Sequence, residues 1–159
     1  MNKYWIKKQN NLFVTDAAWY HKTDSNKARR LAEVAEKVLP AIREFLNLEE
    51  KDGYVVIGHC KAKSTNGYWV PGKKEARVDP RAHSLKSFVE TIAHELVHAQ
   101  QYAQGRLKQD RGIYSWNDKV VGKHPTTHAK YLALPWEIEA REKAKEIVEI
   151  LIQKGLITG

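Results

Sequence analysis

Residues 94–98 read HELVH, and this pentapeptide constrains the fold of the chain more than any other feature. Positions four residues apart on an α-helix lie about 40° from each other around its axis, so His94 and His98 can reach one ion. Neutral imidazoles suit a tetrahedral Zn²⁺ ion, and Glu95 is rotated aside, where it can contact a water without binding the metal. The motif therefore predicts a helix that carries a metal-dependent hydrolase site.

The residues around HELVH predict a helix with one apolar and one polar face. The apolar stripe lies within about 60° of Leu85 on a helical wheel and consists of Phe88, Val89, Ile92, Leu96, Ala99 and Ala103. Both histidines lie on the opposite face, together with Ser87, Thr91 and Gln101. We expect the stripe to pack on a core and the histidine face to border either a metal or solvent.

A catalytic zinc ion usually has three protein ligands and one open position, so a third ligand has to be found. Gln101 and Gln104 occupy the glycine and third histidine positions of the pattern HExxHxxGxxH, which excludes the metzincin class. A second helix is predicted over residues 135–155, which begin with proline and end with glycine. The third ligand is therefore sought on that helix.

Glu137 begins the apolar stripe of this second helix, whereas Glu139 lies on its far side and is expected to be solvated. A carboxylate that faces a core needs an ion or hydrogen-bond partner. Two imidazoles and Zn²⁺ would provide it. The alternative is a buried salt bridge with Arg141 or Lys123.

The motifs HELVH and PWEIEA, the latter at residues 135–140, together resemble the short gluzincin-type metalloproteases of phages and bacteria. Trp116 takes the place of a tryptophan that lies between the two motifs in those proteins, and the resemblance covers about residues 54–145. It implies a zincin-like fold, with Glu137 as the third Zn²⁺ ligand. Many relatives have an aspartate that supports a histidine ligand where this chain has Arg141, so the supporting group is left unassigned.

The expected reaction is zinc-dependent hydrolysis of a peptide bond in a peptide or protein substrate. Zn²⁺ held by His94, His98 and Glu137 would activate a water in the fourth position and polarise the scissile carbonyl. Glu95 would act as general base and return the proton to the leaving amine.

The sequence HPTTH at residues 124–128 offers an alternative third ligand. SprT-like proteases resemble this chain in having a third histidine in a loop after HExxH, which would be His124 or His128. Pro125 argues against a helix across this segment. The alternative to a ligand role is that both histidines are exposed in a loop. His128 and Tyr131 are also the two candidates for a donor to a developing oxyanion.

Length and composition favour one domain over residues 1–159, with a core at about 24–154 and a β extension at 1–20. The chain has neither an apolar run long enough to span a bilayer nor a signal-like start, so we expect a cytoplasmic protein without membrane contact. Cys60 is the only cysteine, which excludes an internal disulfide; we expect it to be a buried strand residue.

The net charge of +8, from 27 Lys and Arg against 19 Asp and Glu, favours anionic partners. The basic residues are scattered and no base-reading motif is present. A nucleic-acid-binding protein with a structural metal is therefore the alternative hypothesis from outside the enzymes, and nucleic acid is a secondary partner. Oligomeric state is not predicted.

The order of predicted elements indicates an α+β fold. A packing helix from residue 24 or 25 to 46, bent at Pro40, precedes three short strands, in YVVIGHC and on both sides of Gly72. The HExxH helix follows, as in the general zincin arrangement, in which an exposed strand edge binds extended peptide. Residues 105–134 are expected to be a long binding loop or lid that includes a short strand at KVV and places Tyr114 and Trp116 beside the site.

Overall fold

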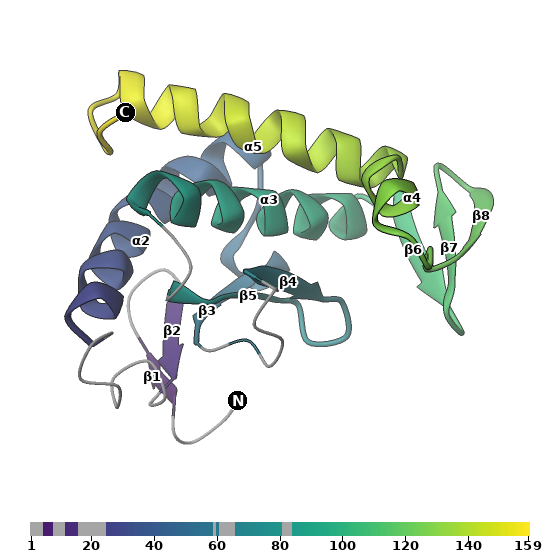
Figure 1. Ribbon diagram of the computed structural model, residues 1–159, viewed down its shortest axis with the longest axis horizontal. Coiled ribbons are helices and arrows are strands. Elements are labelled where there is room, and N and C mark those ends of the chain that lie inside the picture. Colours follow the sequence, from purple (N-terminus) through teal and green to yellow (C-terminus); the bar gives the residue numbers. More distant parts are fainter. Residues whose placement is uncertain (1–4, 8–11, 16–24, 59, 61–65, 81–83) are drawn as a thin grey trace.

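The computed structural model describes residues 5–7, 12–15, 25–58, 60, 66–80 and 84–159. Within these residues the chain forms four α-helices, one short 3₁₀ helix and two small β-sheets, which confirms the predicted α+β class (Figure 1). Every described helix is either too short or too polar to cross a lipid bilayer.

The larger sheet contains five strands in the order β1-β2-β3-β5-β4. The strands are β1 (Trp5–Lys7), β2 (Leu12–Thr15), β3 (Tyr54–Ile57), β4 (Gly67–Val70) and β5 (Glu75–Val78). The three inner strands are parallel to one another, and β1 and β4 pair antiparallel at the two edges. Strand β4 therefore has one side that is not paired by any described strand.

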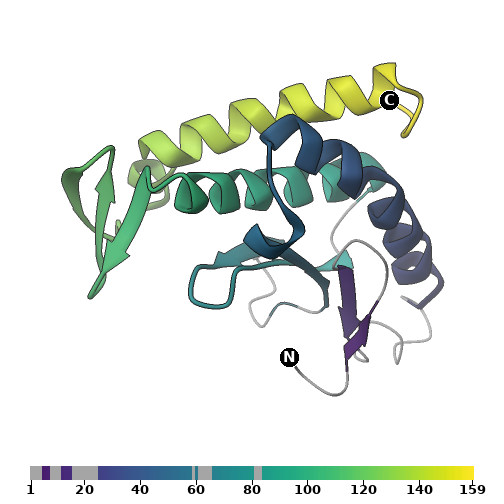
Figure 2. The ribbon, with the colours of Figure 1, turned by 180° about the vertical axis from the view of Figure 1, so that it is seen from behind.

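The strands β1 and β2 belong to the larger sheet, whereas the sequence predicted only a β extension at residues 1–20. Leu12 and Val14 are fully buried in the core, and β2 pairs in parallel with β3. Parallel neighbours need a crossover, which α2 (Ser25–Leu46) provides before the 3₁₀ helix η1 (Glu50–Asp52) leads into β3. Helix α2 continues through Pro40 and changes direction along its length (Figure 2), as expected where a backbone donor is missing.

Helix α3 (Leu85–Ala103) carries the HELVH motif and lies between the five-stranded sheet and helix α5 (Pro135–Gln153) (Figure 1). The Ser84 side chain caps its N-terminus by accepting a hydrogen bond from the Ser87 amide. The predicted apolar stripe is buried from Phe88 to Ala99. Helices α3 and α5 run antiparallel, so the start of α5 lies against the C-terminal half of α3, which contains both histidines.

The prediction of a long loop over residues 105–134 is wrong, except for its short strand at KVV, which is present. This segment forms a three-stranded antiparallel sheet of β6 (Leu107–Asp110), β7 (Ile113–Trp116) and β8 (Lys119–Lys123), followed by the short helix α4 (His128–Leu132). Both hairpins turn through two consecutive residues with positive φ, Arg111-Gly112 and Asn117-Asp118. The strands lack apolar alternation because most of their side chains are exposed or only half-buried.

One further expectation needs correction. Cys60 is buried, but it follows β3 instead of belonging to it, and its amide donates to the Asp79 carboxylate. Near the C-terminus, Ile157 is only 6% exposed and packs in the core. Gly155, with φ of +71°, allows the chain to turn back after α5 as the sequence predicted.

Gly67→Ala is predicted to destabilise the contact between β4 and α3. The added Cβ would lie 2.7 Å from Thr91 Cγ2 and 3.0 Å from the Arg77 carbonyl oxygen. We expect a loss of about 1–3 kcal/mol in the free energy of unfolding, measured with urea. Gly72→Ala, in the turn of the same hairpin, is the control, because nothing lies within 4 Å of its Cβ position. Equal stabilities of the two variants would contradict this packing.

Candidate metal centre

Two adjacent turns of α3 and the first turn of α5 bring His94, His98 and Glu137 together. One potential ligand atom from each residue lies within 4.8 Å of the others. Glu137 Oε1 lies 2.7 Å from His98 Nε2, and Glu137 Oε2 lies 3.4 Å from His94 Nε2. The two imidazoles meet edge to face, with ring centroids 5.1 Å apart. The structure thus places the three predicted ligands in one group that can hold a metal ion.

The carboxylate in this group is buried and incompletely satisfied. Glu137 is 2% exposed, and its Oε1 accepts a hydrogen bond of 2.9 Å from the Tyr131 hydroxyl. Its Oε2 is buried without a hydrogen-bond donor among the described residues. A buried carboxylate oxygen in this state is costly. A cation between Oε2 and the imidazoles would remove that cost, so these residues fit a metal.

Electrostatic coupling within the group changes the proton affinity of Glu137 and His98. Burial alone would raise the pKa of Glu137, but the adjacent imidazoles of His94 and His98 hold that pKa well below its usual range. Burial alone would lower the pKa of His98, but the hydrogen bond to Glu137 and the charges of Glu95 and Glu137 outweigh it and raise the pKa to about 9. Opposite charges therefore favour each other in the metal-free group.

Neither the proposed salt-bridge partners of Glu137 nor the alternative histidine ligands take part in this group. Arg141 donates to the Leu132 carbonyl at 2.6 Å. His124 and His128, both in the described part of the chain, are not members of the three-residue group. Pro125 lies outside the helices as expected, and His128 begins α4 after the Thr127 cap.

Gln101 is the residue that sequence reasoning missed. It was placed on the polar face of α3, yet it is 0% exposed, and its Oε1 lies 2.8 Å from His98 Nδ1. Gln101, and not Arg141, is therefore the residue whose side chain contacts this ring nitrogen of His98. Its spacing of three residues from His98 on one helix was the available signal.

Glu139 is not the solvated charge that the sequence predicted. Its carboxylate accepts hydrogen bonds from Gln101 Nε2 at 3.2 Å and from Arg106 Nη1 at 2.8 Å. Although Glu139 faces away from the apolar stripe of α5, the chain after α3 returns over that side and brings Arg106 to it. The helical wheel of α5 alone contains no information about this neighbour.

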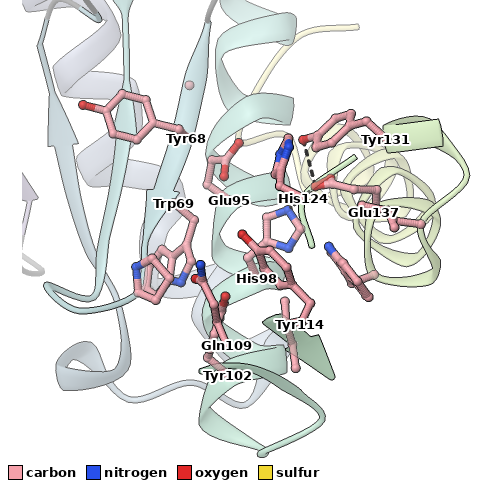
Figure 3. A pocket seen from close by; sticks show the side chains of 15 residues that line it. Tyr68, Trp69, Glu95, His98, Tyr102, Gln109, Tyr114, His124, Tyr131 and Glu137 are labelled. Carbon is pink, nitrogen blue, oxygen red and sulfur yellow. Dashed lines mark hydrogen bonds and ion pairs between the residues drawn. The ribbon is translucent and has the colours of Figure 1, made fainter. Parts of the chain in front are cut away.

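A cavity of about 200 Å³ opens beside the group (Figure 3). Glu95, His98 and Glu137 form its floor, between the edge strand β4 and the second sheet. Aromatic side chains from five elements make up half of the remaining lining residues: Tyr68, Trp69, Tyr102, Tyr114, Tyr131 and Trp136. Glu95 is 7% exposed, and burial raises the pKa of its carboxyl above the usual range.

The residues expected beside the site divide into two sets. Tyr114 and His124 line the cavity, with ring centroids 6.4 Å apart. Trp116 does not line the cavity. Its ring centroid lies 6.0 Å from that of Trp136, and the Arg106 guanidinium lies 5.3 Å from the centroid of the Trp116 ring. The second sheet thus supplies one wall of the cavity and an aromatic support behind it.

No family model, curated protein or solved structure matches this chain. The chemical interpretation of the site therefore depends on its own residues and their geometry.

Zn²⁺ is expected to stabilise the protein against thermal unfolding, because the buried carboxylate gains its missing partner. At a free concentration 100 times the Kd, the gain is about 2.7 kcal/mol, measured by calorimetry with and without metal. Glu137→Gln should lose most of this gain, whereas Glu142→Gln, exposed on the same helix, should retain it. One tightly bound zinc per chain in Glu137→Gln would contradict the assignment.

Proposed function

We propose that this protein is a zinc-dependent peptidase with a zincin-like fold. The observation that carries the proposal is the meeting of His94, His98 and Glu137 at a cavity that also contains Glu95. Two nitrogen ligands and one carboxylate are a common donor set for catalytic zinc. The glutamate that follows the first histidine is then adjacent to the metal without being one of its ligands.

The number and placement of the ligands support a catalytic metal over a structural one. Structural zinc sites are usually closed by four protein ligands. Among the described residues the group contains three, and two of them, His98 and Glu137, border the cavity. A fourth position facing this space would be open to water or substrate.

Glu95 has the environment expected of a general base. Burial raises the pKa of its carboxyl above the usual range, which makes the carboxylate a stronger proton acceptor. A Zn²⁺ ion bound by the three ligands would supply the Lewis acidity. Glu95 would accept a proton from the attacking water and return it to the leaving amine. Tyr131, whose hydroxyl lies at Glu137, would donate to the oxygen that gains charge.

The edge strand beside Glu95 supports a peptide as the substrate. Gly67, Tyr68 and Trp69 of β4 line the cavity, and the Cβ position of Gly67 is 3.7 Å from Glu95 Cγ. An extended peptide that pairs with the free edge of β4 would place its carbonyl groups next to this carboxylate. Polar groups of Gln109, on β6, and His124 line the cavity as well.

Trp69 adds a second feature that supports a polar ligand. Its indole Nε1 is buried and has no acceptor among the described residues. Buried indole donors usually have a partner, so a bound peptide carbonyl would complete this one.

Glu95→Gln is predicted to retain one zinc per chain and to lose about 10²- to 10⁴-fold in turnover, because only the proton acceptor is removed. Metal content is measured by mass spectrometry and turnover with a mixture of internally quenched peptides. Glu90→Gln, on the same helix, is the control and should resemble the parent protein, whereas His94→Ala should lose both metal and turnover. Parent-level turnover in Glu95→Gln would exclude Glu95 as the base.

Tyr131→Phe is predicted to lower kcat by about 10²- to 10³-fold when the protein is saturated with zinc, as for the loss of one donor to a developing oxyanion. Zinc is kept in excess because the variant also loses the hydrogen bond from Tyr131 to Glu137. His128→Ala is the matched control, because His128 was the other candidate and is exposed at the start of α4. The same peptide assay measures both. A normal kcat in Tyr131→Phe, or a large loss in His128→Ala, would reverse the assignment.

A further inference from the structure

We propose that Gln101 positions His98 for metal binding by determining which ring nitrogen carries the proton. This inference rests on the proposed zinc site and names the residue that supports it. Gln101 does not line the cavity, so it would act through His98 and not on a substrate.

The contacts of Gln101 determine the orientation of its amide. Gln101 Nε2 lies 3.0 Å from the Trp136 carbonyl oxygen and 3.2 Å from Glu139 Oε1. Both groups only accept hydrogen bonds, so the amide nitrogen has to face them. Gln101 Oε1 therefore faces His98 Nδ1, at 2.8 Å.

This orientation has a direct consequence for the imidazole. Because an amide oxygen only accepts, His98 Nδ1 must carry a proton and donate it. In the metal-free group Nε2 also donates, to Glu137 Oε1 at 2.7 Å, so Nε2 is the nitrogen whose proton a metal would replace. With a metal bound, the neutral ring would present its Nε2 lone pair toward the position where the three ligands meet.

A second set of contacts keeps Glu139 in place as an acceptor for Gln101. Arg106 Nη1 lies 2.8 Å from Glu139 Oε2, and Lys143 Nζ lies 3.5 Å from Glu139 Oε1. The Arg106 guanidinium is also held over the Trp116 ring. The polar contacts therefore run from His98 through the fully buried amide of Gln101 to Glu139 on α5, and from there to the cations of Arg106 and Lys143.

The first test measures the ring directly in the unmodified protein. Histidine with ¹⁵N in its ring is incorporated, and the protein is loaded with ¹¹³Cd²⁺ as a probe for the metal. We expect ¹¹³Cd coupling to Nε2 of His98 and a slowly exchanging proton on Nδ1. Coupling to Nδ1, or a rapidly exchanging Nδ1 proton, would overturn the inference even though metal is bound.

The second test compares zinc affinities by competition with a chelator. Gln101→Leu removes the acceptor at similar size and is expected to weaken zinc binding by about 10- to 100-fold. Gln153→Leu, which removes an exposed amide from the end of α5, should bind zinc like the parent. The exchange Gln101→Glu with Glu139→Gln retains an acceptor for Nδ1 and the net charge, so it should recover most of the affinity.

The outcomes separate this inference from the proposed function. A parent protein that binds no zinc refutes the metal site itself. Zinc binding by the parent, with equal affinity in Gln101→Leu, refutes only the role of Gln101. If Gln101→Leu does not fold, as judged by circular dichroism, the exchange variant and the ¹¹³Cd spectrum decide. An exchange variant that folds but binds zinc about 10- to 100-fold more weakly than the parent also refutes the role of Gln101.

Discussion

The site depends on one constraint: the carboxylate of Glu137 is buried between two imidazoles and has to be satisfied there. The antiparallel packing of α3 and α5 creates this situation, because the first turn of α5 lies over the turns of α3 that carry His94 and His98. A buried carboxylate without partners would be strongly unfavourable. His98 and the Tyr131 hydroxyl satisfy one of its oxygens, and the other, 3.4 Å from His94 Nε2, is available to a cation.

The same pair of helices also supplies the support behind the ligands. Gln101 is on α3 and Glu139 is on α5, and they meet on the side of His98 that faces away from Glu137. One helix interface therefore places a ligand and its supporting partner simultaneously. Arg106 and Trp116 connect this interface to the second sheet, so that sheet is coupled to the site and is not merely an insertion between the two helices.

The two sheets have different roles around the cavity. Strand β4 presents a free edge next to Glu95 because the hairpin β4–β5 ends the larger sheet on that side. Strands β6 and β7 and the segment leading into α4 form the opposite wall with Gln109, Tyr114 and His124. The catalytic carboxylate proposed for the site thus lies at the base of a space that is bounded by backbone on one side and aromatic groups on the other.

Local periodicity in the sequence determined the helix over residues 85–103, the inward direction of Glu137 and the strands of the larger sheet, because these features depend on neighbours a few residues apart. Only the tertiary structure decided the burial of Gln101 and the ion pair of Glu139, since their partners come from elements distant in the sequence. The sheet within residues 105–134 was also hidden, because its strands have little buried surface and therefore lack apolar alternation. A helical wheel shows which face a side chain occupies, but the element that covers this face is set by how the whole chain packs.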